Sequence, residues 1–356
     1  MSENPYKDLP PHHFWQSGVA LCSPFNMKNI YIKKWGLDPA WNIATAGSCF
    51  AQHISRHLKV HGCNVLDMEP PPPGLPESQH SRFGYSMYSC RYGNIYTAPQ
   101  LMQLVKEAIG IFNPSDIAWM KSDKFYDSQR PGTEPEGFNS IDVLLSHRAH
   151  HLSCVRDMLI QMDLFIFTLG LTEAWVHNES GTIYPLSPGT IAGVYDKNKY
   201  SFKNFTYQEN IDAITNTLEL LNEFRKGKQI KLILTVSPVP LTATASGNHV
   251  LNATNYSKST LRSVAGTLSD TYEDIDYFPS YEIITNQAAR GLFYEPNLRT
   301  VRDQGIDVVM QTFLSEQGLT KDRVTEFNNS PVASFASEKS YIQCEEALLE
   351  AFNAVK

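Results

Sequence analysis

The chain has 356 residues and a formal net charge of −7, because 37 acidic residues outnumber 30 lysines and arginines. At about 150 residues per domain, this length predicts two domains or one large α/β domain with insertions. The acidic balance argues against a nucleic-acid-binding protein, and no apolar run approaches the roughly 18 residues of a membrane-spanning helix. Six scattered cysteines without a CxxC pair disfavour a zinc site and a disulfide framework. We therefore expect no nucleic-acid partner and no membrane span, and nothing implies a metal or a cofactor.

The N-terminal part of the chain predicts an arm, a strand and a helix. Residues 1–37 are rich in proline and aromatic residues and begin without the apolar core of a signal peptide. We therefore expect a cytoplasmic protein with an irregular arm lying over the domain surface. Trp41–Ala46 is short and apolar and predicts a strand. Phe50–His61 has apolar residues on one helical face and predicts a helix that Gly62 ends, followed by a second short strand at 64–67.

The next segments predict a stiff loop, two helices and a buried strand. Residues 69–82 contain five prolines, a composition typical of an extended surface loop. Helices are predicted at 99–111 and 140–162, with a loop-like stretch between them at 112–139. The nearly continuous apolar run at 163–169 is typical of a central parallel strand.

The remaining segments continue the alternation of strands and helices. Residues 170–207 are rich in Gly, Pro, Ser and Asn and predict an excursion from the sheet with a small hairpin. The elements then expected, in chain order, are a helix at 207–224, a strand at 229–236, a loop at 240–252, a helix at 253–268, a strand at 274–278 and a helix at 302–313.

This alternation predicts a mainly parallel sheet covered by helices on both faces. The expected organisation is the arm at 1–37, one α/β domain at 38–320, and a tail with a short helix at 321–356. The insertions into the domain are expected at about 69–98, 112–139 and 176–206. Sheets of this kind bind ligands beyond the carboxyl ends of their strands. Three segments fall at that edge: Gly47–Ser48, Gly170–Glu173 and Ser237–His249.

Ser48 lies at a predicted strand-to-helix junction, within Gly47-Ser-Cys-Phe-Ala51. A serine there can face the sheet edge with its own N–H directed at a developing oxyanion. The structural alternative is equally physical, since serine is a preferred helix N-cap and glycine permits a tight turn. Cys49 is a rival nucleophile beside the same helix N-terminus, although buried packing is the favoured role for it.

Three groups of histidines could carry chemistry. His53, His57 and His61 are spaced four apart on one helix, a spacing that can present ligands to a metal, but no cysteine or carboxylate set completes a site. A second group at 147–151 is interpreted as surface. His249 differs, because it follows a predicted strand and therefore falls on the same edge as Ser48, where an imidazole can act as a general base.

A set of segments, in this order along the chain, resembles the GSCFA family over roughly residues 25–315. The segments are GSCFA at 47–51, RYGNIY at 91–96, FTLGLTEAW at 167–175, TVSPVP at 235–240, YSKS at 256–259 and YFPSYE at 277–282. That family is itself similar to SGNH (GDSL-like) hydrolases. The resemblance implies a flavodoxin-like three-layer α/β/α sandwich and hydrolysis or transfer of acyl esters.

Carried over residue by residue, the resemblance implies a nucleophile at Ser48 and an oxyanion glycine at Gly93, with Asn94 beside it. The glycine-containing segment expected after the central strand falls at Gly170–Glu173, with Thr172 where the hydrolases carry asparagine. The predicted oxyanion and substrate-binding residues are therefore Gly47, Gly93, Asn94, Gly170, Thr172 and Glu173.

The chain departs from the hydrolase pattern at Asn297-Leu-Arg-Thr300, which stands where those enzymes carry an aspartate and a histidine. A serine without a base is a poor nucleophile. Either His249 supplies the base from a neighbouring loop, oriented by Glu173 or Glu282, or another group does, or Ser48 is not a conventional nucleophile.

The first functional hypothesis is an acyl-ester hydrolase or O-acyltransferase that acts on an acylated sugar or glycan-type substrate through an acyl-Ser48 intermediate. The aromatic side chains considered for stacking on sugar rings are Tyr92, Tyr96, Trp175 and Tyr184. The second hypothesis is a non-catalytic carbohydrate- or metabolite-binding protein, and the third is a metal-dependent hydrolase that uses His53 and His57. No pattern in the sequence specifies an oligomeric state.

Overall fold

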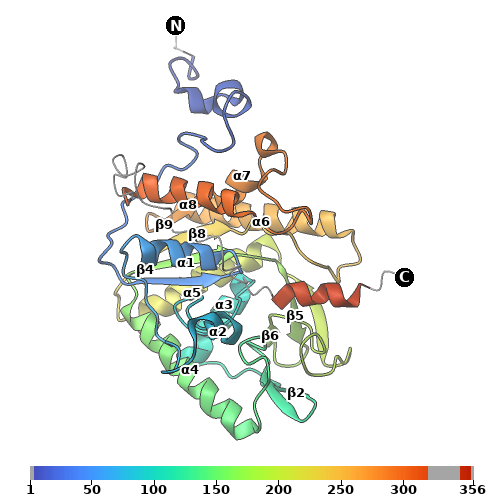
Figure 1. Ribbon diagram of the computed structural model, residues 1–356. Helices are drawn as coiled ribbons and strands as arrows, with labels where there is room; N and C mark the ends of the chain where they lie inside the picture. The colour runs from blue at the N-terminus through green and yellow to red at the C-terminus, as the bar shows by residue number, and fades with distance from the viewer. Residues whose placement is uncertain (1–3, 320–344, 354–356) are drawn as a thin grey trace.

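The computed structural model describes residues 4–319 and 345–353, and its centre is a four-stranded parallel sheet (Figure 1). The strands lie in the order β1-β4-β8-β9 and are almost entirely buried, as expected of strands covered on both faces. Their bounds are Ile43–Gly47 (β1), Leu164–Leu169 (β4), Lys231–Val236 (β8) and Ile275–Phe278 (β9).

The strand predicted at 64–67 is reduced to one parallel bridge between Val65 and Ile43. This bridge places the segment on the outer side of β1, away from β4. Counting it as a strand position, the order along the sheet becomes 2-1-3-4-5, which is the flavodoxin-like doubly wound order. The predicted α/β class with a mainly parallel sheet is confirmed.

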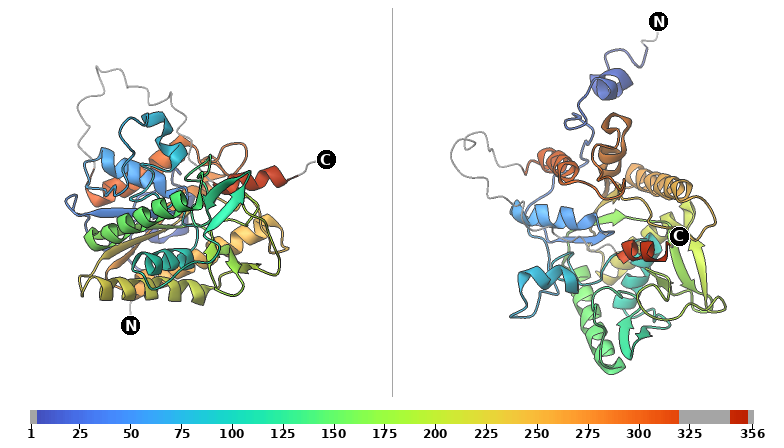
Figure 2. Two further views of the ribbon diagram at one scale, coloured as in Figure 1. Left: turned by 90° about the horizontal axis from the view of Figure 1, so that it is seen from below. Right: turned by 45° about the vertical axis from the view of Figure 1, so that its right-hand side comes forward.

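Helices cover both faces of the sheet and complete a three-layer sandwich (Figures 1 and 2). Phe165 and Phe167 of β4 face a core that α3, α4, α5 and α6 close, whereas Leu164 and Ile166 face a core that α1, α7 and α8 close. The helices span Ala51–Val60 (α1), Glu77–His80 (α2), Ala98–Ala108 (α3), Ile141–Gln161 (α4), Tyr207–Phe224 (α5), Val250–Thr271 (α6), Ser280–Thr285 (α7) and Asp303–Gln317 (α8).

Side-chain caps explain where three of these helices begin. Thr97, Ser140 and Thr206 each precede a helix and accept the backbone N–H of the residue three positions later. The Glu209 side chain also accepts the N–H of Thr206, which completes a capping box on α5. A hydroxyl at this position satisfies an N–H group that has no partner inside the helix, so the predicted start of α5 at Tyr207 is confirmed.

Two small antiparallel sheets lie outside the central one. The segment at 112–139, expected to be loop-like, contains a hairpin of β2 (Ala118–Lys121) and β3 (Lys124–Asp127). The predicted excursion after β4 forms a three-stranded sheet in the order β6-β5-β7. Its strands are Glu173–His177 (β5), Ile183–Tyr184 (β6) and Tyr200–Asn204 (β7).

The N-terminal arm has two parts with different surroundings. The helical turns η1 (Pro11–His13) and η2 (Gln16–Ala20) contain no buried residue and project from the body (Figure 1). Further along, Tyr31 is buried against α8, and its hydroxyl donates to Asp276 of β9 at 2.7 Å and accepts the amide of Gln317 at 3.0 Å. Only this second part packs on the domain as expected of the whole arm.

The tail predicted at 321–356 lies outside the described residues except for 345–353. Within that stretch, η5 (Glu345–Phe352) is helical. Earlier in the chain, short 3-10 turns also form at Ser81–Phe83 (η3) and Gln287–Ala289 (η4). Over residues 4–319 and 345–353, none of the helices has both the length and the apolarity needed to cross a bilayer.

A buried network of charges joins α3, α4 and the β3 hairpin. Arg148 pairs with Glu107 and with Asp127, whose other oxygen accepts Arg130 at 2.9 Å. Glu69 lies 2.6 Å from Nδ1 of His151. Burial together with the charge of Arg130 lowers the pKa of His151 to about 4, against the attraction of Glu69. His151 is therefore neutral at neutral pH. The surface position predicted for the histidines at 147–151 is wrong for His151, which is 2% exposed because it faces the core side of α4 and Glu69.

We expect this buried histidine to make the fold sensitive to mild acid. Its folded-state pKa is below the ordinary value of about 6.5, so the unfolded chain binds more protons as the pH falls below 6.5. Its contribution to stability is full above pH 6.5 and decreases toward pH 4, by about 2 kcal/mol between pH 7 and pH 5. Burial lowers the pKa of His53 to about 3, which adds a loss of similar size.

Urea unfolding at pH 7 and pH 5 tests this expectation. His151→Gln keeps a donor for Glu69 but cannot titrate, so it should lose about 2 kcal/mol less than the wild type over this range. His150→Gln, on the exposed side of the same helix, is the matched control and should behave like the wild type. An equal loss in all three proteins would contradict the expectation.

Candidate active site

The strand order places a topological switch point between the carboxyl ends of β1 and β4. The chain leaves β1 toward α1 on one face of the sheet, and after β4 it reaches α5 on the other face by way of β5, β6 and β7. At such a switch point the two connections diverge, and ligands bind in the space between them. The segments at 47–48 and 170–173 both lie here, as predicted.

Ser48 is the first residue after β1 and is buried. Its N–H donates to the carbonyl oxygen of Thr168 at 3.1 Å, so this N–H is not available to the oxyanion that the sequence analysis assigned to it. Its Oγ has no hydrogen-bond partner among the residues that the structure describes. Other buried hydroxyls share this state, among them those of Ser55, Thr168 and Thr172, so the position directly after β1 is what distinguishes Ser48.

Two glycines allow the backbone to pass on either side of Ser48. Gly47 has φ +137°, and a Cβ there would lie 2.7 Å from the backbone nitrogen of Thr168. At Gly170, a Cβ would lie 2.9 Å from Cβ of Ser48. Glycine is therefore required at both positions by close approach, and at Gly47 also by conformation.

The segment containing Gly93 and Asn94 is held beside the end of β1. Ile95 donates its N–H to the carbonyl of Gly47 at 2.9 Å, and Tyr96 accepts the N–H of Gly170 at 3.1 Å. The Asn94 side chain takes part in this arrangement through the Tyr88 hydroxyl, which lies 2.6 Å from Asn94 Oδ1 and 3.1 Å from the carbonyl oxygen of Ser48. Gly93 adopts the left-handed conformation at φ +68°.

Thr172 and Glu173 follow the end of β4 and are both buried. The N–H of Thr172 donates to Oγ of Ser257 at 2.9 Å, and its own Oγ1 has no partner within the described residues. Glu173 accepts the hydroxyl of Thr244 at 2.8 Å. Burial raises the pKa of Glu173, against the effect of that hydrogen bond.

Lys258 is a member of the site that the sequence analysis did not propose. Its Nζ donates to the carbonyl oxygen of Gly170 at 2.7 Å, and the residue is only 1% exposed. Gly170 also packs on Ser48, so the ammonium group and the serine both contact the same glycine. A lysine on the buried face of a helix, three residues before Leu261 and seven before Ala265, is the signal that could have revealed it.

His249 lies on the predicted edge but faces solvent. It is the N-cap of α6, and its Nδ1 accepts the N–H of Leu251 at 3.1 Å. Since Ser48 Oγ has no partner in the described part of the chain, no hydrogen bond joins it to His249. The structure therefore places this histidine near the edge without connecting it to the serine.

Glu282, the other predicted orienting residue, is held by a different set of contacts. Its carboxylate pairs with Arg262 of α6 and accepts the hydroxyl of Tyr277 at 2.7 Å. The guanidinium of Arg262 also lies 4.1 Å from the Tyr277 ring centre. Neither His249 nor Ser48 is a partner of Glu282 in these contacts, whereas Glu173 is linked to the His249 loop through Thr244.

The segment at 297–300, where the resemblance expected a base, presents an arginine instead. Asn297 accepts the N–H groups of Arg299 and Thr300 and closes a turn. The Arg299 guanidinium donates to the carbonyl of Pro240 at 3.2 Å and pairs with Glu346 of η5 at 3.1 Å. This segment therefore reaches the loop after β8 without contributing a proton acceptor.

The predicted stacking aromatics are mostly core residues. Tyr92, Tyr96 and Tyr184 are buried, whereas Trp175 is half-buried and packs edge-on against Tyr195 and Phe202. Of the four side chains, only Trp175 keeps an accessible surface of any size for a sugar ring.

The histidines of α1 are engaged with their own helix. Nδ1 of His57 lies 2.9 Å from the carbonyl of His53, and Nδ1 of His61 lies 2.8 Å from that of His57. In the described ranges, no group of three or more His, Cys, Asp or Glu side chains could hold a metal ion. Cys49 is buried, in line with a packing role.

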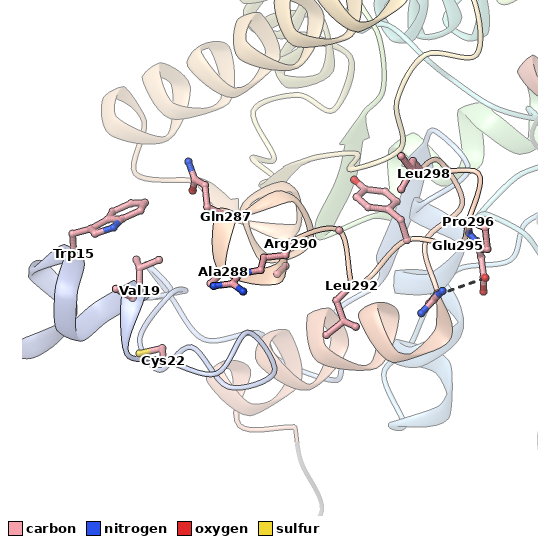
Figure 3. Close-up of a pocket in the computed structure, with 15 residues that line it drawn as sticks. Trp15, Val19, Cys22, Gln287, Ala288, Arg290, Leu292, Glu295, Pro296 and Leu298 are labelled. Carbon is pink, nitrogen blue, oxygen red and sulfur yellow. Dashed lines mark ion pairs between the residues drawn. The ribbon is translucent and has the colours of Figure 1, made fainter.

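A recess lies elsewhere, between the projecting arm and the 287–302 segment (Figure 3). It has a volume of about 790 Å³ and is open to solvent. The side chains of Trp15 and Val19 face those of Gln287 and Leu292 across it. Ser48 does not line this recess, so the recess is separate from the switch point.

Comparison with known proteins agrees with the ordered segments in the sequence. The profile of the GSCFA family matches residues 42–313, which is most of the chain and includes β1, β4, β8, β9 and the helices between them. No curated protein and no solved structure matched the chain in the corresponding searches. The extent of the family match is sufficient to conclude that this chain belongs to the GSCFA family.

Proposed function

We propose that the protein is a serine-dependent acyl-ester hydrolase or O-acyltransferase that forms an acyl-Ser48 intermediate on an acylated sugar or glycan-type substrate. The observation that carries this proposal is the buried Ser48 Oγ, which has no hydrogen-bond partner among the described residues and lies at the switch point of the sheet. Several buried hydroxyls in the described residues have no partner, but Ser48 stands at the position where such sheets bind their ligands.

The proposed reaction has two steps. Ser48 Oγ forms a bond to the ester carbonyl carbon, its proton passes to a base, and the alcohol leaves with a proton as the C–O bond breaks. Water or an acceptor hydroxyl then attacks the acyl-serine and regenerates the hydroxyl of Ser48. Hydrolysis and transfer differ only in which of these acceptors reaches the intermediate.

Lys258 supports this chemistry electrostatically. Its ammonium group is bound to Gly170, the residue that packs on Ser48, and a fixed positive charge in a water-excluded site stabilises negative charge that develops on the reacting oxygens. Gly93 remains the proposed oxyanion glycine. For the base we retain His249, and Lys258 acts only through its charge.

The second candidate function is a non-catalytic carbohydrate- or metabolite-binding protein. Two observations favour it: Arg299 stands in the segment where a base was expected, and His249 is bound to Leu251 as a helix cap. The two functions differ in one property, because only the enzyme requires an activated Ser48.

The test is intact-mass spectrometry after exposure to a fluorophosphonate, which reports an activated serine without knowledge of the substrate. We expect one adduct on the wild type and none on Ser48→Ala. Ser55→Ala is the matched control, because Ser55 is also buried with an unsatisfied hydroxyl but lies within α1, away from the switch point. It should label like the wild type.

The remaining outcomes discriminate among the candidates. Loss of the adduct in His249→Ala would identify His249 as the base, and an unchanged adduct in that variant would exclude His249 from that role. A wild type that forms no adduct, or an adduct that persists in Ser48→Ala, would overturn the proposed enzyme.

A further inference from the structure

The C-terminal helix η5 buries acidic side chains and exposes apolar ones. Glu345 and Glu346 at its start are buried, whereas Leu348 and Phe352 are 49% and 66% exposed. A helix that packs for hydrophobic reasons buries its apolar side and leaves its carboxylates in water. Here the acidic end is inserted, beyond the carboxyl ends of the strands (Figure 1). The contacts of the two carboxylates therefore need their own explanation.

Glu346 is bound by groups that recognise a carboxylate. Its Oε1 accepts the N–H of Thr242 at 3.0 Å, and its Oε2 pairs with the Arg299 guanidinium at 3.1 Å. Its own N–H lies 3.4 Å from the hydroxyl of Tyr96. A guanidinium combined with a backbone N–H is a strong, charge-assisted arrangement for a carboxylate. Arg299 is 15% exposed at its side chain, so this pair is largely shielded from water.

The Glu345 carboxylate lies against Gly132, where only a glycine leaves room for it. Its Oε1 accepts the N–H of Gly132 at 2.9 Å. A Cβ at Gly132 would overlap this carboxylate, lying 2.8 Å from Cδ of Glu345. Gly132 does not have a positive φ, so space for the carboxylate, and not backbone conformation, explains the glycine. On its other side the carboxylate oxygen would lie 3.7 Å from a Cβ at Gly93.

The groups that bind Glu345 and Glu346 border the candidate active site. Tyr96, next to Glu346, accepts the N–H of Gly170, which packs on Ser48. Gly93, next to Glu345, lies in the segment that is tied to Gly47. The two glutamates of η5 therefore occupy the rim between the segment at 93–96, the loop after β8 and Arg299.

We infer that Arg299, the Thr242 N–H and the Gly132 N–H form a carboxylate-binding subsite at the rim of the candidate active site, which Glu345 and Glu346 of the chain itself occupy here. The inference rests on the proposed function in one respect: the ligand that displaces these glutamates is the acyl-ester substrate, which accordingly carries a carboxylate, as an acidic glycan does. Arg299 thus recognises the substrate and takes no part in proton transfer.

Two readouts test the subsite on the full-length chain. The first is the rate at which iodoacetamide alkylates a cysteine at position 48 in the Ser48→Cys background, followed on the corresponding peptide by mass spectrometry. The second is calorimetric binding of trigalacturonate, which carries three carboxylates, compared with the neutral trisaccharide maltotriose. Neither readout requires Ser48 to be a nucleophile.

Glu346→Gln and Gly132→Ala each weaken the binding of η5 at the subsite. Both should raise the alkylation rate at least about tenfold, because the site is then open in a larger fraction of the molecules. Glu346→Gln should also bind trigalacturonate at least about tenfold more tightly than the wild type. Glu350→Gln, exposed on the same helix, is the matched control and should change neither value. Arg299→Met should abolish the binding of trigalacturonate, and maltotriose should not bind.

Equal alkylation rates in Glu346→Gln and Glu350→Gln would overturn self-occupancy, and equal binding of the two trisaccharides would overturn carboxylate recognition. Fluorophosphonate labelling separates this inference from the proposed function. Labelling without the expected alkylation and binding would reject the subsite alone. The expected alkylation and binding without any labelling would reject the enzyme and leave the subsite.

Discussion

Lys258→Met is expected to slow the fluorophosphonate labelling of Ser48 by about 10²–10³-fold, the loss that follows removal of one electrostatic group from an oxyanion-stabilising site. Lys258 Nζ is bound to the carbonyl of Gly170, and Gly170 packs on Ser48. The methionine has a similar length and apolarity but no charge. Circular dichroism checks that the variant is folded, because the substitution removes the ammonium donor from the buried carbonyl of Gly170.

Three comparisons make this result specific to the charge. Lys258→Arg retains a cation and should recover part of the rate. Lys231→Met removes a half-buried lysine at the opposite end of β8 and should label like the wild type. The pH dependence of labelling should differ between Lys258→Met and the wild type, whereas a merely structural role would leave it unchanged. Labelling of folded Lys258→Met at the wild-type rate and with the wild-type pH dependence would show that the ammonium group has no part in the reaction.

Gly47→Ala is expected to destabilise the fold by at least about 4 kcal/mol, which is at the upper end for a single substitution. The added Cβ would overlap the backbone of Thr168 in β4, and φ +137° is a conformation that alanine rarely adopts. Neither strand can move away easily, since β1 and β4 pair along their whole lengths and are buried on both faces.

Guanidinium unfolding measures this loss. Gly36→Ala is the matched control, because a Cβ at Gly36 would meet nothing within 4 Å and its φ is not positive. It should stay within about 0.5 kcal/mol of the wild type, as exposed substitutions usually do. A folded Gly47→Ala within 1 kcal/mol of the wild type, on the order of that same variation, would contradict the steric argument.

The parallel sheet and its flanking helices could be predicted because their sequence signals are long and mutually consistent. Tyr207–Phe224 combines a helical apolar period with a capping box, so its observed bounds agree with the predicted ones. The hairpin of β2 and β3 and the six-residue helix α7 were missed because their periods are too short to stand out from loop composition. The sequence at 64–67 predicted a strand, but this segment forms only one bridge, at Val65, and no continuous ladder.

Only those site residues whose position follows from the order of the strands could be predicted. The carboxyl ends of parallel strands meet at one edge, so Ser48 and Gly170 could be placed together from their positions after two strands. The direction of a side chain in a loop does not follow from strand order. His249 was therefore placed at the correct edge, but its side chain caps α6. Lys258 was missed because lysine is rarely buried, and Arg299 because its partner Glu346 lies 47 residues along the chain.

The position of Tyr31 has a consequence for how the chain folds. Its hydroxyl joins partners 245 and 286 residues further along, Asp276 and Gln317. Contacts of such sequence separation form late, because a long loop must close before they contribute. The face of the sheet covered by α1 and α8 therefore stays incomplete until α8 has been synthesised. The opposite core, built largely from α3, α4 and α5, precedes it along the chain and is free to consolidate first.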